Sequence, residues 1–228
     1  MALSQRYEEV EAPFLDKGRY TEDEYFALED RSPDRWEFIP TDVPGMNDLR
    51  VGLIRAMSGG MPDHAAIMAN LITALTLALR DKGNRMCRVF SSDLKVHNAD
   101  GRNTYPDVSV VCGTLSHHRR RRDIVTNPIL VAEVLSPSTQ AGDRGAKRLS
   151  YQTVPTLRHV LLLAADRPHV ELYTREEDGG RWESVTAEGN ETSIVLSGLD
   201  LTLALADLYD LVEFDEEEPG DPDDHGID

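Results

Sequence analysis

The sequence has few cysteines and no long hydrophobic run. Its two cysteines, Cys87 and Cys112, each lie in an apolar stretch, and no further cysteine completes a zinc-type spacing. We therefore expect two reduced, buried thiols in a cytosolic protein. The longest apolar run, residues 160–165, is far shorter than the roughly 20 residues of a membrane-spanning helix. The first residues lack the basic-then-apolar pattern of a signal peptide, so we expect no membrane partner and a cytoplasmic location.

Positive charge is also scarce. The chain has 24 Lys and Arg against 41 Asp and Glu, a net charge of -17, whereas a protein that collects DNA normally presents a positive surface. Nine of the acids, and no Lys or Arg, lie in residues 213–228. We interpret this segment as a disordered, solubilising tail, with occupation of a basic groove as the alternative. Residues 1–212 have the length of one domain with its own core and show no internal linker or repeat.

One short segment has the opposite charge. It is His117-His118-Arg119-Arg120-Arg121-Arg122. Such a basic loop could contact phosphates, although charge runs are more often simply solvated.

Local patterns predict an alternation of strands and helices. Thr21 and Glu24 form a capping-box pattern that predicts a short helix. A long helix is predicted at 63–82, because its apolar residues recur on one face and Gly83 can end it. A further helix is expected at 143–153, and a closing one at 204–212. The predicted strands are 35–39, 49–57, 85–90, 93–97, 105–112, 129–135, 158–165, 169–173, 182–186 and 193–203. Together they indicate an α/β fold with a mixed central β-sheet flanked by helices.

Two acids stand within or beside apolar strand patterns. Asp107 follows a proline at the start of one predicted strand, and Glu133 lies inside the next. An acid in such a place is costly to bury unless a cation offsets it. Carboxylate oxygens suit Mg²⁺ or Mn²⁺, so pairing of the two strands would create a divalent metal site. Taken singly the signals have ordinary alternatives, a turn aspartate and an exposed edge glutamate.

A lysine follows on the next predicted helix. Lys147 comes four residues after Asp143 and four before Tyr151, which puts the three on one helical face. If that face covers the sheet end, the ammonium could stabilise negative charge in a phosphoryl-transfer transition state. The alternative is a simple i,i+4 ion pair between Asp143 and Lys147.

These residues also match a known family pattern. The most specific stretch is Glu133-Val134-Leu135-Ser136-Pro137-Ser138-Thr139, followed by Asp143 and Lys147. Further points of likeness are residues 35–39, 57–64, 105–111 and 157–162. On these stretches the chain resembles the Uma-two family of restriction endonucleases, within the PD-(D/E)XK nuclease superfamily. The resemblance covers roughly residues 20–212 and implies a restriction-endonuclease-like core.

The resemblance implies roles for individual residues. Asp107 and Glu133 would bind the metal, and Lys147 would be the catalytic lysine, because Leu135 stands where the superfamily usually has it. Glu37 matches a further acid of the family core that could assist the metal or a water; an exposed strand acid is the alternative. His64 could bind phosphate, although capping or packing of the long helix is favoured. Asp93 has a similarly ambiguous position.

The implied activity is Mg²⁺- or Mn²⁺-dependent endonucleolytic hydrolysis of DNA. The alternative is a non-catalytic scaffold that keeps the nuclease fold and binds nucleic acid or protein, which the acidic composition favours slightly. A homodimer is a further possibility that the sequence does not test. The chain departs from the family at residues 40–48, where an insert replaces a tight turn and puts substrate access in doubt.

Overall fold

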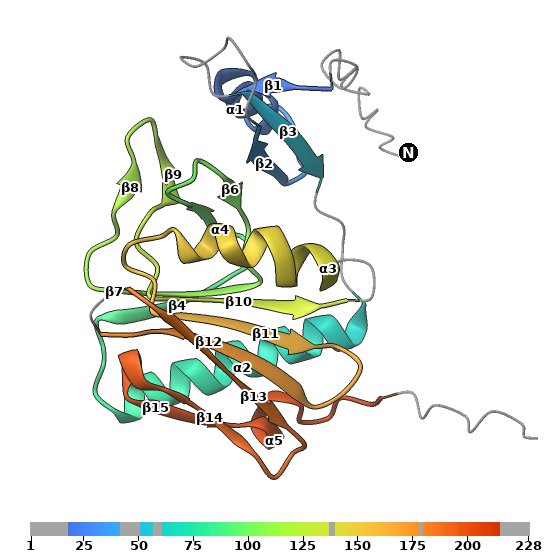
Figure 1. The fold of residues 1–228 in the computed structure, drawn as a ribbon, viewed down its shortest axis with the longest axis vertical. Coiled ribbons are helices and arrows are strands. Elements are labelled where there is room, and N and C mark those ends of the chain that lie inside the picture. The colour runs from blue at the N-terminus through green and yellow to red at the C-terminus, as the bar shows by residue number, and fades with distance from the viewer. Residues whose placement is uncertain (1–17, 42–50, 57–60, 137–139, 178–179, 215–228) are drawn as a thin grey trace, which may run out of the picture.

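The computed structural model of the chain describes residues 18–41, 51–56, 61–136, 140–177 and 180–214. Most of the insert at 40–48, most of the acidic tail at 213–228 and residues 178–179 lie outside these ranges. Within them the chain forms two large β-sheets, a small two-stranded sheet and flanking helices (Figure 1).

A six-stranded sheet forms the centre of the molecule. Its order is β13-β12-β11-β10-β7-β4. β10 and β11 pair in parallel, whereas the other neighbours are antiparallel, which confirms the predicted mixed sheet. The strand bounds are β4 Cys87–Ser91, β7 Val108–Cys112, β10 Leu130–Leu135, β11 His159–Ala164, β12 His169–Arg175 and β13 Trp182–Glu188.

The two faces of this sheet are covered by different helices (Figure 1). Alternate residues of a strand point to opposite faces. Leu130, Ala132 and Val134 of β10 accordingly join the core under helix α2, Pro62–Asp81. Val131 and Leu135 join the cluster on the other face, which is covered by α4, Arg148–Gln152. Glu133 belongs to this second set, so the strand period directs its carboxylate toward the α4 side.

Helix α2 confirms the strongest helix prediction within one residue at each end. Its residues Ile67, Leu71, Leu75 and Leu79 are at most 2% exposed and pack on the sheet. Gly83 follows with φ of 73°, the left-handed conformation that commonly ends a helix. By length and composition α2 could also span a membrane, but here one of its faces belongs to the core.

The second large sheet lies beside α4 and has the order β1-β3-β2-β6-β5-β9-β8 (Figure 1). Helix α1, Glu22–Glu29, packs on it and begins with the predicted capping box. Sequence patterns missed the hairpin β8–β9, since its basic residues do not resemble a strand. The strand bounds are β1 Tyr20–Thr21, β2 Trp36–Pro40, β3 Val51–Ala56, β5 Lys95–His97, β6 Asn103–Thr104, β8 His117–His118 and β9 Arg121–Val125.

The predicted helix at 143–153 is present but irregular. It starts with a short turn, α3, Gln140–Gly142, and continues through a π-turn, Asp143–Lys147, into α4. Gly145 interrupts the helical backbone with φ of -93° and ψ of -111°. π-turns insert an extra residue and are frequent at functional sites. Here the π-turn carries both Asp143 and Lys147.

The C-terminal prediction was wrong in one respect. The segment 193–203 is not one strand but two, β14 (Ser193–Leu196) and β15 (Leu201–Ala204), which pair with each other. A short 3₁₀ turn and the left-handed residue Asp200, φ 53°, reverse the chain between them. The closing helix α5 spans only Leu205–Leu208.

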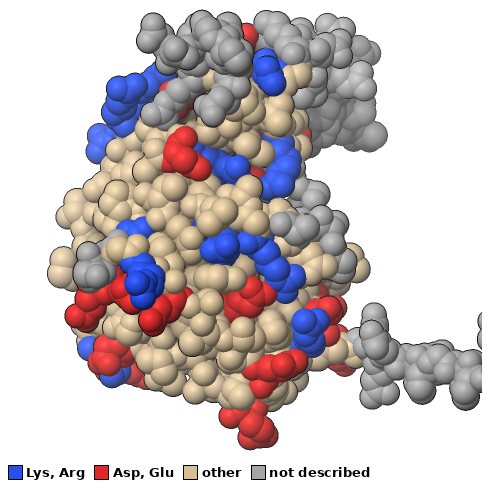
Figure 2. Space-filling model, viewed as in Figure 1, with Lys and Arg blue, Asp and Glu red and all other residues tan. Residues whose placement is uncertain are grey.

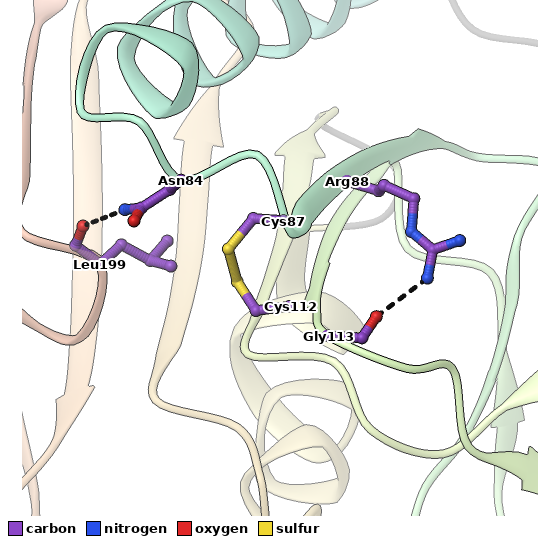
Figure 3. The surroundings of a disulfide bond; sticks show 6 residues. All are labelled: Asn84, Cys87, Arg88, Cys112, Gly113 and Leu199. Atoms are coloured by element: carbon purple, nitrogen blue, oxygen red, sulfur yellow. Dashed lines mark hydrogen bonds between the residues drawn. A yellow bond between two sulfur atoms is a disulfide. The ribbon is translucent and has the colours of Figure 1, made fainter.

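The expectation of two free thiols was also wrong. Cys87 and Cys112 form a disulfide (Figure 3). They are direct partners in the antiparallel pair β4–β7, and their Cα atoms are 3.9 Å apart. A sequence separation of 25 positions hides this pairing, which only the strand register reveals.

Candidate active site

Strand register brings the two predicted metal-binding acids together. β7 and β10 pair with Val108 opposite Ala132, so the next antiparallel step sets Asp107 against Glu133. The Asp107 carboxylate accepts a hydrogen bond from the Val134 backbone N–H at 2.7 Å. Asp107 and Glu133 are only 7% and 4% exposed. The two carboxylates are therefore neighbours at one end of the sheet, where protein covers most of their surface.

Lys147 lies among three carboxylates. Its Nζ is 2.9 Å from Glu133 Oε1, 3.2 Å from Glu37 Oε1 and 3.8 Å from Asp143 Oδ1. Tyr151, one helical turn further along α4, donates its hydroxyl to the same oxygen of Glu133. The predicted face of Asp143, Lys147 and Tyr151 thus does cover the sheet at Glu133.

Glu37 joins this group from the other sheet. Strand β2 places it opposite Arg55 of β3, and its Oε2 accepts from the Arg55 guanidinium at 2.5 Å. Its Oε1 faces Lys147 and the Tyr105 backbone N–H, at 3.2 and 3.4 Å. Glu37 is 1% exposed, so the alternative of an exposed strand acid is wrong. Arg55 was missed by sequence reasoning, because the insert after β2 obscured the register that pairs it with Glu37.

His64 contacts the site through Asp107. It is the third residue of α2, and its Nε2 lies 3.2 Å from Asp107 Oδ2. Met61 rather than His64 occupies the N-cap position, and it makes no side-chain cap hydrogen bond. The hydrogen bond to Asp107 raises the pKa of His64 above its ordinary value, although burial opposes the shift. His64 therefore supports Asp107 instead of capping the helix.

Asp93 does not belong to the site. Its side chain is 86% exposed and pairs with Arg35 at 3.2 Å. Of the acids considered from the sequence, the structure brings together Asp107, Glu133, Asp143 and Glu37, and it leaves Asp93 at the surface.

Negative charge exceeds positive charge in this group. The group has four buried carboxylates, those of Asp107, Glu133, Asp143 and Glu37. They face two permanent cations, Lys147 and Arg55, together with His64. Burial raises the pKa of Glu133 well above its usual value, and the charges of Asp107 and Asp143 raise it further, against the opposing charge of Lys147. Burial alone would lower the pKa of Lys147, but Glu133, Glu37 and Asp143 together raise it. The lysine stays charged, while Glu133 gains from any additional cation.

The donor set suits a hard divalent cation. Asp107 uses Oδ2, and Glu133 uses Oε1, for all their hydrogen bonds and ion pairs with described residues. The other oxygen of each remains available for a ligand. Mg²⁺ and Mn²⁺ are commonly bound by one or two carboxylates together with waters and substrate phosphate. Within the described ranges no group of three or more His, Cys, Asp or Glu side chains forms a complete metal cage. The residues therefore fit an open two-carboxylate site and not a closed structural one.

A mixed sheet between helices, with paired acids at the sheet end and a lysine on the covering helix, defines a restriction-endonuclease-like α/β protein. Residues 22–206 match the Uma2 family, which is described as "Putative restriction endonuclease". The chain belongs to this family, whose description supports a nuclease function.

Two relatives from Synechocystis sp. are similar over most of their length. "Uncharacterized protein slr1290" is 33% identical over 199 residues, covering 87% of this chain and 94% of the relative. "Uncharacterized protein sll1609" is 30% identical over 175 residues, covering 76% of this chain and 90% of the relative. A crystal structure from Anabaena variabilis, described as "a putative nuclease belonging to DUF820", superposes with a TM-score of 0.61 at 18% identity. The match covers 83% of this chain and 97% of the Anabaena chain, and it shows that the two proteins share a fold.

Proposed function

We propose that the protein is an endonuclease of the PD-(D/E)XK type that hydrolyses DNA phosphodiester bonds with Mg²⁺ or Mn²⁺. The observation that carries the proposal is the proximity of Asp107, just before β7, to Glu133 of the paired strand β10. Both lie within a buried group that has more acids than cations. Asp107 and Glu133 would hold the cation. When bound, such a cation neutralises charge on the phosphate and activates water.

The other residues of the site have separate tasks in this proposal. Lys147 keeps its proton and contributes a fixed positive charge that favours the negative transition state. Glu37 is a positioning residue, because it holds both Lys147 and Arg55. Tyr151 fixes one oxygen of Glu133, and His64 fixes one oxygen of Asp107, so that neither carboxylate rotates freely.

A non-catalytic scaffold is the second candidate. Lys147 and Tyr151 already satisfy Glu133 Oε1 without any added cation. A protein that had lost its metal could keep this arrangement and still bind nucleic acid or another protein. Metal binding that depends on the two acids separates the candidates.

The test combines calorimetry with cleavage of supercoiled plasmid in Mg²⁺ or Mn²⁺. We expect Asp107→Asn and Glu133→Gln, which keep side-chain shape, to lose metal binding and to lower cleavage by about 10²–10³-fold or more. Asp93→Asn is the matched control, since it removes one exposed acid outside the site and should cleave like the parent. Circular dichroism of each variant would show whether the fold is retained.

Two results would count against the proposal. Equal residual nicking by the parent and by folded Asp107→Asn and Glu133→Gln proteins would show that a contaminant cuts the DNA. Absence of Mn²⁺ binding to the folded parent protein would favour the scaffold.

A further inference from the structure

Two adjoining cavities lie at the end of the central sheet where α2 stops and β4 begins. Their volumes are about 550 and 620 Å³, and Arg85 and Arg88 line both of them. One also contains Arg122 and His117 from the β8–β9 hairpin, and the other contains Arg80 from α2. We call the surface formed by Arg80, Arg85, Arg88 and Arg122 the arginine surface.

The arginine surface is basic in a strongly acidic chain. No Asp or Glu lines either cavity, although the sequence has 41 acids and only 24 basic residues. Its four arginines are exposed and form no ion pair with a described residue. Their neighbours in sequence behave differently, because Arg120 pairs with Glu22 and Arg121 pairs with Asp30. Part of the basic segment thus stabilises the fold, while Arg122 remains available for an external anion.

The floor of the arginine surface is fixed in place. Cys87 lines one of the two cavities, and its disulfide with Cys112 joins β4 to β7 (Figure 3). Arg88 donates a hydrogen bond to the Gly113 carbonyl at 3.0 Å, and Asn84 donates to the Leu199 carbonyl (Figure 3). The backbone that carries Arg85 and Arg88 is therefore held from two sides, and little ordering remains to be done when a ligand binds.

The arginine surface is remote from the candidate active site. His64 stands near the start of α2 and contacts Asp107, whereas Arg80 stands near the end of the same helix. Sixteen residues of α-helix correspond to about 24 Å, or about seven base pairs of DNA. A ligand on the arginine surface does not touch the buried carboxylates, but a duplex is long enough to reach between the two regions.

We propose that the arginine surface binds the phosphate backbone of double-stranded DNA. Arginine guanidinium groups suit phosphate oxygens through charge and paired hydrogen bonds. The lining contains no Phe, Tyr or Trp, the side chains on which unpaired bases stack, which favours a duplex over a single strand. The choice of DNA rests on the proposed function, and the surface deepens it by assigning binding to a region away from the chemistry.

Charge distribution elsewhere agrees with this assignment. Figure 2 shows acidic side chains concentrated in the lower part of the viewed face, while Lys and Arg lie mainly across its upper and middle parts. The net charge of -17 is therefore not spread evenly, and local basic regions can bind a polyanion despite it.

The test measures binding, without cleavage, of a fluorescein-labelled 20-base-pair duplex in EDTA, by fluorescence anisotropy from 50 to 200 mM NaCl. The variant is Arg85→Ala/Arg122→Ala, because neither side chain has a described partner whose loss would disturb the fold. The matched control is Arg19→Ala/Arg181→Ala, which removes the same charge from exposed positions just before β1 and β13.

We expect the Arg85→Ala/Arg122→Ala protein to bind on the order of 100-fold more weakly at 0.1 M salt, with the slope of log K against log salt reduced by about 2. The control should stay close to the parent. If the parent also cleaves DNA, the variant should raise KM and leave kcat unchanged.

Unchanged duplex affinity in Arg85→Ala/Arg122→Ala, an equal loss in the control, or tighter binding of single-stranded than of double-stranded DNA would each overturn the inference. Failure of the two proposals can be told apart. A parent that binds duplex through these arginines but never cleaves it keeps the arginine surface and refutes the nuclease proposal. A parent that cleaves DNA normally, together with a variant that keeps the parent's affinity and KM, supports the nuclease proposal and refutes the arginine surface.

Discussion

The two ends of the central sheet differ in whether their charged side chains are buried and paired. At the end near the start of α2, Asp107, Glu133 and Lys147 are at most 7% exposed and contact other charged groups. At the other end, Arg85 and Arg122 are exposed and contact no described acid. The same helix and strands connect both ends, so the difference comes from what covers them.

Burial determines what each set of charges can do. In a medium that excludes water, charges interact strongly and their protonation shifts, as the raised pKa of Glu133 indicates. The proposed function assigns the chemistry to this buried group for that reason. Exposed arginines are surrounded by water and salt, which screen their charge, so they can attract a polyanion without changing its reactivity. In the two proposals above, the buried charges therefore serve catalysis and the exposed arginines serve DNA binding.

The largest expected change in stability concerns the end of the sheet where charges are buried. Lys147→Ala leaves Glu133, Glu37 and Asp143 without their shared cation, so we expect the free energy of unfolding to fall by about 3–5 kcal/mol. Urea denaturation followed by circular dichroism measures it. A loss below about 1 kcal/mol would mean that the acids take up protons in place of the lysine and that the ion pairs are weak.

A second effect concerns a buried neutral histidine at the opposite end. His159 is fully buried, its Nε2 accepts from the Gly198 N–H at 3.0 Å, and burial lowers its pKa to about 4. The unfolded chain binds a proton near pH 6.5, whereas the folded protein does so only near pH 4. Stability is therefore full above pH 6.5 and is lost as the pH falls, by about 3 kcal/mol in total.

Unfolding of the parent and of His159→Gln between pH 7 and pH 4 checks this prediction. The carboxylates titrate in both proteins, so the difference between the two curves isolates His159. Parallel curves would mean that His159 takes up its proton equally in the folded and unfolded states.

The smallest effect is expected for an exposed ion pair. Lys82 lies just after α2 and contacts Asp200 at 2.7 Å, but the two side chains are 50% and 86% exposed. Lys82→Ala should lower the free energy of unfolding by only about 0.2–1 kcal/mol, measured alongside Lys147→Ala. A loss as large as that of Lys147→Ala would show that burial does not distinguish the two ends.

Much of the local structure could be predicted from the sequence. The spacing of Ile67, Leu71, Leu75 and Leu79 located α2, because helical periodicity depends only on neighbours along the chain. The capping box at Thr21 and the strands around Glu133 followed from equally local patterns. The helix at 143–153 was predicted, but its π-turn at Asp143–Lys147 was not, since a single glycine gives little indication of such a kink.

The site was only partly predictable. Asp107, Glu133, Lys147 and Glu37 were singled out from the sequence, and the structure brings them together; their catalytic and metal-binding roles stay predictions. The contact of His64 with Asp107 and of Arg55 with Glu37 became visible only with the helix start and the strand register in place. The sequence also gave the wrong state for Cys87 and Cys112.

The amino-acid sequence by itself determined where most helices and strands form, and which acids lie within or beside apolar strand patterns. Tertiary structure alone decided that Glu37 and Glu133, from different sheets, share one lysine. It likewise decided that arginines from α2, β4 and the β8–β9 hairpin line one surface. The reason is physical: local propensity acts over a few residues, whereas these contacts join residues far apart in the chain, and only the packing of the sheets specifies them.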